Sequence, residues 1–355
     1  MNVLDNRMYL EDINLIANLD LPWHKLNNHS LMLSGATGLV GSFLVDVIME
    51  KNVQDNLNCT VYALVRNIEK AKNRFLKYID NPNLFFISYD VTLPFDNNEI
   101  GTIDYILHLA SNTHPLLYAT DPIGTITTNI IGVQNMLEFA VKHNSTRFAF
   151  TSSNEAYGEN RGDVEIFDED YCGYINCNTL RAGYPESKRC GEALCQAYKQ
   201  QKGLDIVIPR ITRTFGPTMN MTDTKAISQF IKKCIAGEDI VLKSVGNQYF
   251  SYTYVADAVS GLLWVLLAGE SGEAYNIAFE GGDITLKDLA NTIAGFNGKQ
   301  VVFEIPDEVE AAGYSKATKA LLDGSKLQKL GWKPMYDIKT GLERTISILK
   351  DIEEK

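Results

Sequence analysis

Two short stretches of the sequence carry side chains that could transfer protons. The first, LRAGYPESKRCGEAL, places Tyr184 and Lys188 four residues apart, so on a helix both side chains project from one face. A phenol with a pKa of about 10 is a weak base, and a neighbouring ammonium favours its ionised form. The pair could therefore accept a proton from a substrate hydroxyl, although a plain surface Tyr/Lys pair has the same spacing.

The second stretch, TSSNEAYGE (151–159), follows an apolar run and holds Ser153, Asn154 and Glu155. A hydroxyl, an amide and a carboxylate are thus gathered in three consecutive residues. The amide of Asn154 cannot donate a catalytic proton. Glu155 is either a catalytic carboxylate or one that caps a loop or a helix.

The elements that would position these stretches alternate between strands and helices up to about residue 210. Helical spacing of apolar residues predicts helices over Val40–Lys51, Ile123–His143 and Ala182–Gln201. The predicted strands cover residues 31–35, 61–65, 84–90, 105–110, 147–152 and 205–210. This alternation predicts an α/β fold, a doubly wound parallel sheet of the Rossmann type with helices on both faces. Beyond residue 210 the pattern changes, which predicts a smaller C-terminal lobe.

A glycine-rich turn follows the first predicted strand. In LMLSGATGLVGSFLVDVIM, Gly35, Gly38 and Gly41 stand between a strand and an amphipathic helix. The first two glycines would let the backbone approach a pyrophosphate at the helix N-terminus, and the third would allow close helix–strand packing. The motif predicts a dinucleotide site; a merely structural turn is the alternative.

The end of the second strand bears on which dinucleotide would bind. An NAD-selective site usually offers an acid to the ribose there, but this chain has Val65 followed by Arg66. Arg66 could accept the 2′-phosphate of NADP, stack on adenine or remain solvated. Asp90 and Val91, at the end of the third strand, could meet the adenine, or Asp90 could form a turn. Both NAD and NADP remain open.

Together these motifs resemble the extended short-chain dehydrogenase/reductase family of nucleotide-sugar epimerases, dehydratases and decarboxylases. The similarity extends to HLAS (108–111), FGP (215–217), SYTYVADAV (251–259) and LGW (330–332). It implies an N-terminal helical extension (1–28), a Rossmann domain over 29–212 to which 248–276 return, and a lobe for a nucleoside diphosphate sugar over 213–247 and 277–355. It also implies a homodimer built on the predicted helices Ile123–His143 and Ala182–Gln201.

The resemblance also implies roles for individual residues. The catalytic triad falls on Ser153, Tyr184 and Lys188. The expected cofactor contacts are Gly35, Thr37, Gly38, Leu39, Val40, Gly41, Arg66, Asp90, Val91, Leu109, Ala110, Ser111, Tyr184 and Lys188. The expected substrate contacts are Asn154, Glu155, Arg181, Arg213, Lys225 and His114, of which His114 could equally be structural.

Within the family, EDYCGYIN, LRAGYPESK and FGPTMNMTDT are most similar to UDP-glucuronate decarboxylases. Three positions depart from their pattern. Arg213 replaces an Asn, Phe250 replaces an Arg, and the C-terminal Arg-x-Pro segment reads KATKALLDGSK, with Lys319 the nearest cation. Arg213 could offset the cation lost at 250 by holding the diphosphate from the other side.

The resemblance implies oxidation at C4 of the sugar to a 4-keto intermediate, after which Glu155 would face C5 and C6. Family dehydratases often carry an acid where this chain has Asn154, and simple 4-epimerases lack the Glu. We therefore expect a chain most like a UDP-glucuronate decarboxylase. A 4,6-dehydratase or epimerase is the alternative, and a catalytically silent cofactor-binding scaffold a more distant one.

Composition excludes several other classes of partner. The net charge of −11 over 355 residues opposes binding to nucleic acid. The six cysteines lack zinc-like spacing, so we expect reduced thiols and no metal. No apolar stretch approaches the roughly 20 residues of a membrane span, and the N-terminus lacks the features of a signal peptide. We expect a cytoplasmic protein.

Overall fold

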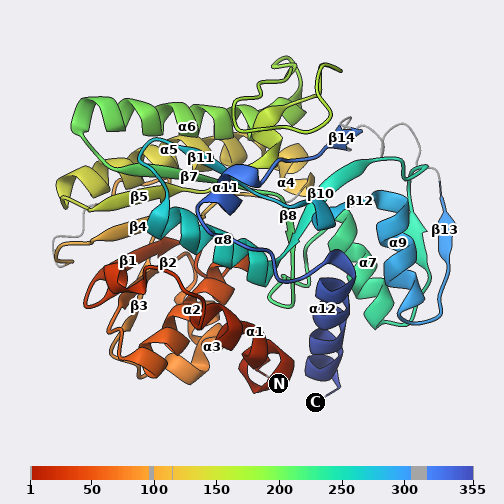
Figure 1. Cartoon of the computed structure of the whole chain (residues 1–355), viewed down its shortest axis with the longest axis horizontal. Coiled ribbons are helices and arrows are strands. Elements are labelled where there is room, and N and C mark those ends of the chain that lie inside the picture. The colour runs from red at the N-terminus through yellow and green to blue at the C-terminus, as the bar shows by residue number, and fades with distance from the viewer. Residues whose placement is uncertain (1, 96–99, 114, 305–317, 355) are drawn as a thin grey trace.

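Figure 1 shows the computed structural model of the chain, which describes residues 2–95, 100–113, 115–304 and 318–354. Its main sheet has the strand order β11-β7-β5-β4-β1-β2-β3, and the short β6 also pairs with β7. The strands are β1 (Ser30–Ser34), β2 (Thr60–Val65), β3 (Leu84–Ser88), β4 (Tyr105–His108), β5 (Arg147–Phe150), β6 (Ser152–Ser153), β7 (Ile206–Ile211) and β11 (Ala274–Ile277). Their pairs are parallel, so the predicted doubly wound α/β fold is confirmed.

Helices cover both faces of this sheet (Figure 1). One face packs on α5 (Pro122–Lys142) and α6 (Gly183–Lys202), and the other on α2 (Leu39–Asp55) and α8 (Val255–Ala268). Side chains of β1 alternate between the two faces: Leu31 and Leu33 join the core under α2 and α8, and Met32 joins the core under α5. This alternation is what buries a strand on both sides.

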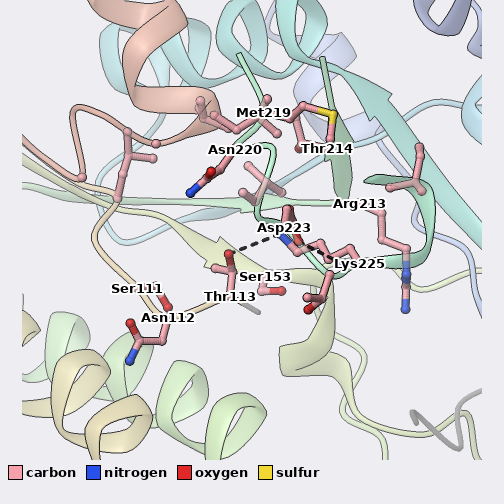
Figure 2. A pocket seen from close by; sticks show the side chains of 18 of the residues that line it. Ser111, Asn112, Thr113, Ser153, Arg213, Thr214, Met219, Asn220, Asp223 and Lys225 are labelled. Atoms are coloured by element: carbon pink, nitrogen blue, oxygen red, sulfur yellow. Dashed lines mark hydrogen bonds and ion pairs between the residues drawn. The ribbon is translucent and has the colours of Figure 1, made fainter. Parts of the chain in front are cut away.

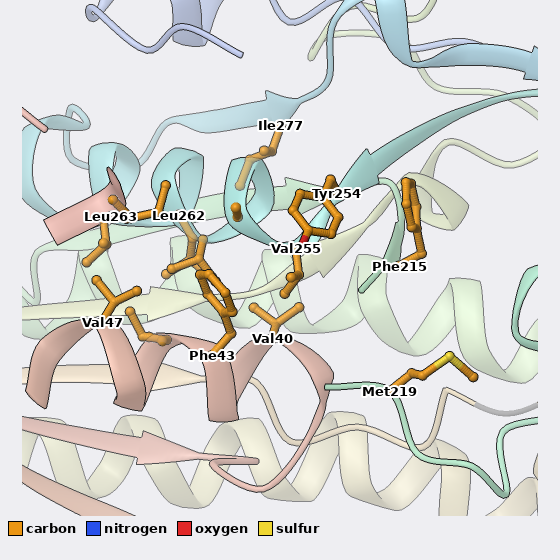
Figure 3. Close-up of a cluster of buried hydrophobic side chains, with 14 of the residues drawn as sticks. Val40, Phe43, Val47, Phe215, Met219, Tyr254, Val255, Leu262, Leu263 and Ile277 are labelled. Carbon is orange, nitrogen blue, oxygen red and sulfur yellow. The ribbon is translucent and has the colours of Figure 1, made fainter. Parts of the chain in front are cut away.

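The packing of α2 against α8 places the glycine-rich turn. Val40, Phe43 and Val47 on α2 face Leu262 and Leu263 on α8 (Figure 3). Phe43, Val47, Leu262 and Leu263 are fully buried. The N-terminal end of α2 is therefore held by apolar packing at the carboxyl edge of the sheet.

The smaller lobe is built on a second sheet, in which β10 (Tyr249–Tyr254) pairs with three short strands. It runs antiparallel to β12 (Asp283–Thr285) and parallel to β14 (Lys319–Ala320) and β8 (Arg213–Phe215). The remaining elements of the lobe are α7 (Ala226–Ile235), β9 (Ile240–Leu242), α9 (Leu286–Gly295), β13 (Val301–Phe303), α11 (Ser325–Lys329) and α12 (Ile338–Glu353).

The segment 248–276, expected to return to the Rossmann domain, is divided between the two sheets. Its later elements, α8 and β11, pack on or join the main sheet, whereas β10 lies in the centre of the smaller one. The reason is that β8 follows directly on β7 but pairs with β10 instead of the main sheet. The other boundaries between the lobes stay a prediction.

The N-terminal extension contains the helix α1 (Arg7–Ala17), which contacts both lobes. Tyr9 donates a hydrogen bond of 2.5 Å to Asp46 on α2. On the same helix, Asp12 accepts hydrogen bonds of 2.6 Å from Tyr254 and Tyr336. The extension thus connects α2 to the smaller lobe. None of the helices in the described part of the chain is long and apolar enough to cross a membrane.

Candidate active site

The predicted site residues line one cavity of about 1290 Å³ between the main sheet and the smaller lobe. It opens at the carboxyl ends of β1, β2, β4, β6 and β7, where parallel sheets usually bind ligands. All the expected cofactor contacts lie in its wall, as do Ser153, Asn154, Glu155, Arg181, Arg213 and Lys225. His114 lies outside the described residues. These placements leave the individual roles as predictions.

The glycine-rich turn has the geometry that a pyrophosphate requires. Gly35 has a φ of +72°, and a Cβ added there would lie 2.9 Å from the amide nitrogen of Ala110. A Cβ at Gly41 would lie 2.3 Å from the carbonyl oxygen of Gly35. The helix α2 begins after Gly38 without a side-chain cap, so its first N–H groups are available to an anion. The turn therefore fits the pyrophosphate of a dinucleotide.

The residues expected near the adenosine lie at the ends of β2 and β3. Arg66 is exposed in the wall of the cavity. Asp90 accepts hydrogen bonds from the backbone N–H and the hydroxyl of Thr92, at 2.9 and 2.8 Å, and these bonds lower its pKa. Its carboxylate thus forms a turn, which was the structural alternative considered for it.

The three residues of the predicted triad lie on β6 and α6. Ser153 accepts a hydrogen bond from the backbone N–H of Glu155 at 3.2 Å, and the Lys188 ammonium donates to the carbonyl oxygen of Thr151 at 2.9 Å. Tyr184 and Lys188 are both buried, with the ammonium nitrogen 5.9 Å from the centroid of the phenol ring. The i, i+4 spacing on one helix brings them together.

Burial dominates the electrostatics of Tyr184 and Lys188. Burial, and next the charge of Glu155, raise the pKa of Tyr184 above its usual value, although hydrogen bonds with Ser153 and Ser111 oppose the shift. Burial lowers the pKa of Lys188 to about 7. In this structure desolvation outweighs the contacts that favour the phenolate. That Lys188 favours an ionised phenol stays a prediction.

Glu155 does not stand alone in the cavity. It lies on the 3₁₀ turn η4 (Asn154–Tyr157), and Nη2 of Arg181 lies 2.8 Å from each of its carboxylate oxygens. Arg181, on η5 (Leu180–Ala182), also lies over the ring of Tyr118, 4.8 Å from its centroid. Tyr118 in turn stacks on Tyr184, with ring centroids 4.9 Å apart. A continuous series of contacts thus joins Glu155 to the phenol of Tyr184.

The smaller lobe contributes cations to the same cavity (Figure 2). Lys225 lies 3.3 Å from the hydroxyl of Thr113 and 3.4 Å from a carboxylate oxygen of Asp223. Arg213 lies over the ring of Phe250, and its buried Nη1 finds no hydrogen-bond partner among the described residues. An unpaired buried N–H is costly, so this nitrogen is suited to an anionic ligand.

Lys319, the nearest cation in the segment that replaces Arg-x-Pro, has another role. It pairs with the exposed carboxylate of Glu165 and is not among the described residues that line the cavity. It therefore does not replace the missing arginine.

Three further residues next to the predicted site were not predicted from the sequence. Tyr118, on α4 (Pro115–Thr120), packs on Tyr184, and Thr113 contacts Lys225. Asn129 accepts a hydrogen bond from Ser111 at 2.7 Å and donates one to Ser187 on α6 at 2.9 Å. Tyr118 and Thr113 follow β4 at the carboxyl edge of the sheet, a position that could have indicated them.

A metal would need a cluster of ligating side chains. Among the described residues, no group of three or more His, Cys, Asp or Glu side chains is placed to hold one.

Comparison with protein families gives a match over most of the chain. The family model for the NAD dependent epimerase/dehydratase family matches residues 31–278. UDP-glucuronic acid decarboxylase 5 from Arabidopsis thaliana is 32% identical over 320 residues, covering 89% of this chain and 88% of the relative. UDP-glucuronic acid decarboxylase 1 from Xenopus tropicalis is 32% identical over 92% of this chain and 73% of its own length.

Solved structures share the fold at lower sequence identity. A dTDP-glucose 4,6-dehydratase from Streptomyces venezuelae, solved with NAD bound, has a TM-score of 0.77 at 23% identity, covering 92% of this chain and 98% of the neighbour. UDP-glucuronic acid 4-epimerase from Bacillus cereus, in complex with UDP-glucuronic acid and NAD, has a TM-score of 0.76 at 20% identity, covering 91% and 99%.

Proposed function

Because the chain belongs to the NAD-dependent epimerase/dehydratase family, we propose that it decarboxylates UDP-glucuronate through a 4-keto intermediate. Membership confirms the predicted class: the protein is an enzyme that modifies nucleotide sugars with a nicotinamide dinucleotide. The choice of substrate, the reaction after C4 oxidation and the choice between NAD and NADP are proposals. A cytoplasmic location stays a prediction.

One observation supports decarboxylation over dehydration most directly. Arg181 contacts both carboxylate oxygens of Glu155, and the preceding residue is Asn154, which has no acidic proton. A 4,6-dehydration requires a base for the C5 proton and an acid for the leaving C6 hydroxyl. Loss of carbon dioxide from a 4-keto uronic acid requires neither. The pair of side chains therefore suits decarboxylation.

The first step would be oxidation at C4. Tyr184, in its phenolate form, would accept the proton of the C4 hydroxyl, and Ser153 would hydrogen-bond the same oxygen. When bound, the oxidised nicotinamide supplies a hydride acceptor for C4 and later a donor. Lys188 lies beside Tyr184 and holds the backbone carbonyl of Thr151, which fixes the position of the ammonium against the phenol.

The second and third steps would follow from the 4-keto group. The bond between C5 and C6 breaks, carbon dioxide leaves, and the electron pair moves into the enolate of the C4 ketone. C5 then takes a proton from the surroundings. As C4 is reduced again, Tyr184 would give its proton back to the C4 oxygen. The product would be a UDP-pentose.

The smaller lobe would hold the nucleoside diphosphate. We assign the unpaired Nη1 of Arg213 to the diphosphate, in place of the cation that the decarboxylase pattern carries at Phe250. Lys225 lies in the same wall with Asp223 and Thr113. Both lysine and arginine are common phosphate ligands in protein sites.

A homodimer is also proposed. The helices α5 and α6 pack side by side on one face of the sheet (Figure 1). Ile123, Ile126 and Ile131 on α5 are exposed, with 75, 37 and 40% of their surfaces accessible. Two copies could bury these side chains in a seam of four helices. Sedimentation of the protein and of an Ile126→Glu variant tests this: the wild type should be a dimer and the variant a monomer.

The function is tested with a panel of nucleotide sugars. The purified protein is incubated with UDP-glucuronate, UDP-glucose, dTDP-glucose, CDP-glucose and UDP-N-acetylglucosamine, and products are identified by mass. Loss of carbon dioxide from UDP-glucuronate supports the proposal. Loss of water from a neutral sugar would favour the dehydratase, and an isomer of unchanged mass the epimerase.

A further inference from the structure

We propose that Arg181 determines specificity by exchanging partners: it leaves Glu155 and pairs with an anionic group at C6 of the sugar. The inference rests on the proposed function, since it concerns the same substrate site. It adds that the partner of Arg181 depends on the sugar: the C6 group of an anionic sugar, or Glu155 when the sugar is neutral.

The contact between Arg181 and Glu155 is placed for such an exchange. A single nitrogen, Nη2, lies 2.8 Å from both carboxylate oxygens. Both side chains line the cavity and are partly accessible from it, at 29% for Arg181 and 24% for Glu155. A second carboxylate that approaches Arg181 must compete with Glu155 for the same cation, because two like charges at this range repel each other.

The position of Arg181 relates it to the reacting part of the sugar. Its guanidinium lies 4.8 Å from the ring centroid of Tyr118, which stacks on Tyr184 at 4.9 Å. One aromatic ring therefore separates the cation from the phenol that faces C4. The guanidinium is near enough for its charge to oppose the rise in the pKa of Tyr184.

The other cations in the described part of the cavity are occupied or lie elsewhere. Lys225 contacts Asp223 and Thr113, and Lys188 is held against Thr151. Arg213 lies over the ring of Phe250. Burial lowers the pKa of Arg213, and the charge of Glu155 opposes that shift. Arg181 is the cation in direct contact with Glu155. An anionic group at C6 would therefore draw this cation away from Glu155.

The exchange has a chemical consequence. With a uronic acid, Arg181 binds the carboxylate and neutralises it until carbon dioxide leaves. With a neutral sugar, no group at C6 competes for Arg181, so Glu155 remains paired and does not remove the C5 proton. The same pair would thus admit decarboxylation and suppress dehydration.

Binding measurements on the holoenzyme test the exchange. The dissociation constants of UDP-glucuronate and UDP-glucose are measured by calorimetry for the wild type, Glu155→Gln and Arg181→Gln. Glu155→Gln removes the competing charge, so it should bind UDP-glucuronate about ten-fold more tightly and UDP-glucose within about two-fold of the wild type. Arg181→Gln should lose about ten-fold or more for UDP-glucuronate and abolish the preference over UDP-glucose.

Control variants separate this role from a structural one. Arg181→Lys keeps a cation and should restore part of the preference. Arg213→Ala should weaken both ligands equally, and Arg161→Gln, at an exposed ion pair with Asp163, should change neither. A further readout is deuterium uptake at C5 of UDP-glucose in heavy water, which should rise in Arg181→Gln because Glu155 is released.

Two results would overturn the exchange: no tighter binding of UDP-glucuronate by Glu155→Gln, or an unchanged preference in Arg181→Gln. Failure of the proposed function looks different. If the wild type prefers UDP-glucuronate through Arg181 but releases no carbon dioxide, the exchange stands and decarboxylation is wrong. If the wild type releases carbon dioxide but Arg181→Gln keeps the preference for UDP-glucuronate over UDP-glucose, decarboxylation stands and the exchange is wrong.

Discussion

The guanidinium carbon of Arg213 lies 3.5 Å from the centroid of the Phe250 ring. The two residues stand at paired strands, β8 and β10, and both depart from the decarboxylase pattern. The aromatic face holds the cation in the cavity, and its buried Nη1 has no partner among the described residues. Relative to the decarboxylase pattern, position 213 has thus gained a cation and position 250 lacks one.

Replacing Arg213 with alanine should weaken the binding of UDP. Loss of a charge-assisted contact to a phosphate typically costs about 1.5–3 kcal/mol, so affinity should fall about ten-fold to a hundred-fold. Cofactor affinity should stay within about two-fold, since Arg213 lies on the smaller lobe. Calorimetry with UDP measures the change, and Arg161→Ala is the matched control. Unchanged affinity for UDP would show that Arg213 does not offset the cation missing at Phe250.

Replacing Arg66 with alanine should distinguish the two dinucleotides. Arg66 is exposed in the cavity wall at the end of β2, where no acid stands to select NAD. A guanidinium there can pair with a 2′-phosphate. The variant should therefore lose about ten-fold in affinity for NADP, against less than about three-fold for NAD. Fluorescence titration with both reduced cofactors measures this. Equal losses would assign Arg66 to adenine stacking.

Replacing Tyr184 with phenylalanine separates an enzyme from a silent homologue. The variant keeps the ring that stacks on Tyr118 but cannot exchange a proton with C4. Turnover should fall by at least about a hundred-fold, while cofactor affinity stays near the wild-type value. Tyr174→Phe, at an exposed tyrosine, serves as the control. Full activity in Tyr184→Phe would argue against the triad.

Burial of Lys188 should give the cofactor-free protein a characteristic dependence of stability on pH. Its pKa is about 7 in the folded chain, against the ordinary lysine value of 10.5, so between these values the unfolded chain binds more protons. The free energy of unfolding therefore gains a positive slope with pH in this window. The cost of the buried charge is full below pH about 7 and is lost as pH rises to about 10.

The variant Lys188→Met lacks this titrating group and provides the reference. Denaturant unfolding of both proteins at pH about 7 and about 10 should show the wild type gaining stability relative to Lys188→Met as pH rises. A difference between the two proteins that stays constant across this range would mean that Lys188 remains charged when buried.

Much of the site could be predicted because its signals are local in the sequence. The glycine turn requires residues at fixed spacing after a strand, and Tyr184 and Lys188 meet because one helix carries both. The order of strands and helices likewise placed Ser153 and Glu155 at the carboxyl edge of the sheet. These features depend on geometry within one or two neighbouring elements.

Other features depend on tertiary contacts that no local pattern encodes. Arg181 lies 26 positions from Glu155, and their contact arises only when η5 folds back over η4. The stacking of Tyr118 on Tyr184 requires α4 to meet the start of α6. The raised pKa of Tyr184 reflects burial, which the spacing of Tyr and Lys does not determine. The segment 248–276 was expected to return to the Rossmann domain, but its strand β10 pairs with β8, β12 and β14 in the smaller sheet.

The most direct test of decarboxylation uses UDP-glucuronate labelled with heavy carbon at C6. The wild-type holoenzyme should release labelled carbon dioxide and a UDP-pentose in equal amounts, with a transient rise in the ultraviolet absorbance of the reduced cofactor. Tyr184→Phe should release neither product. Retention of the label in a nucleotide sugar of unchanged mass, or loss of water from a neutral sugar while UDP-glucuronate stays intact, would contradict the proposed function.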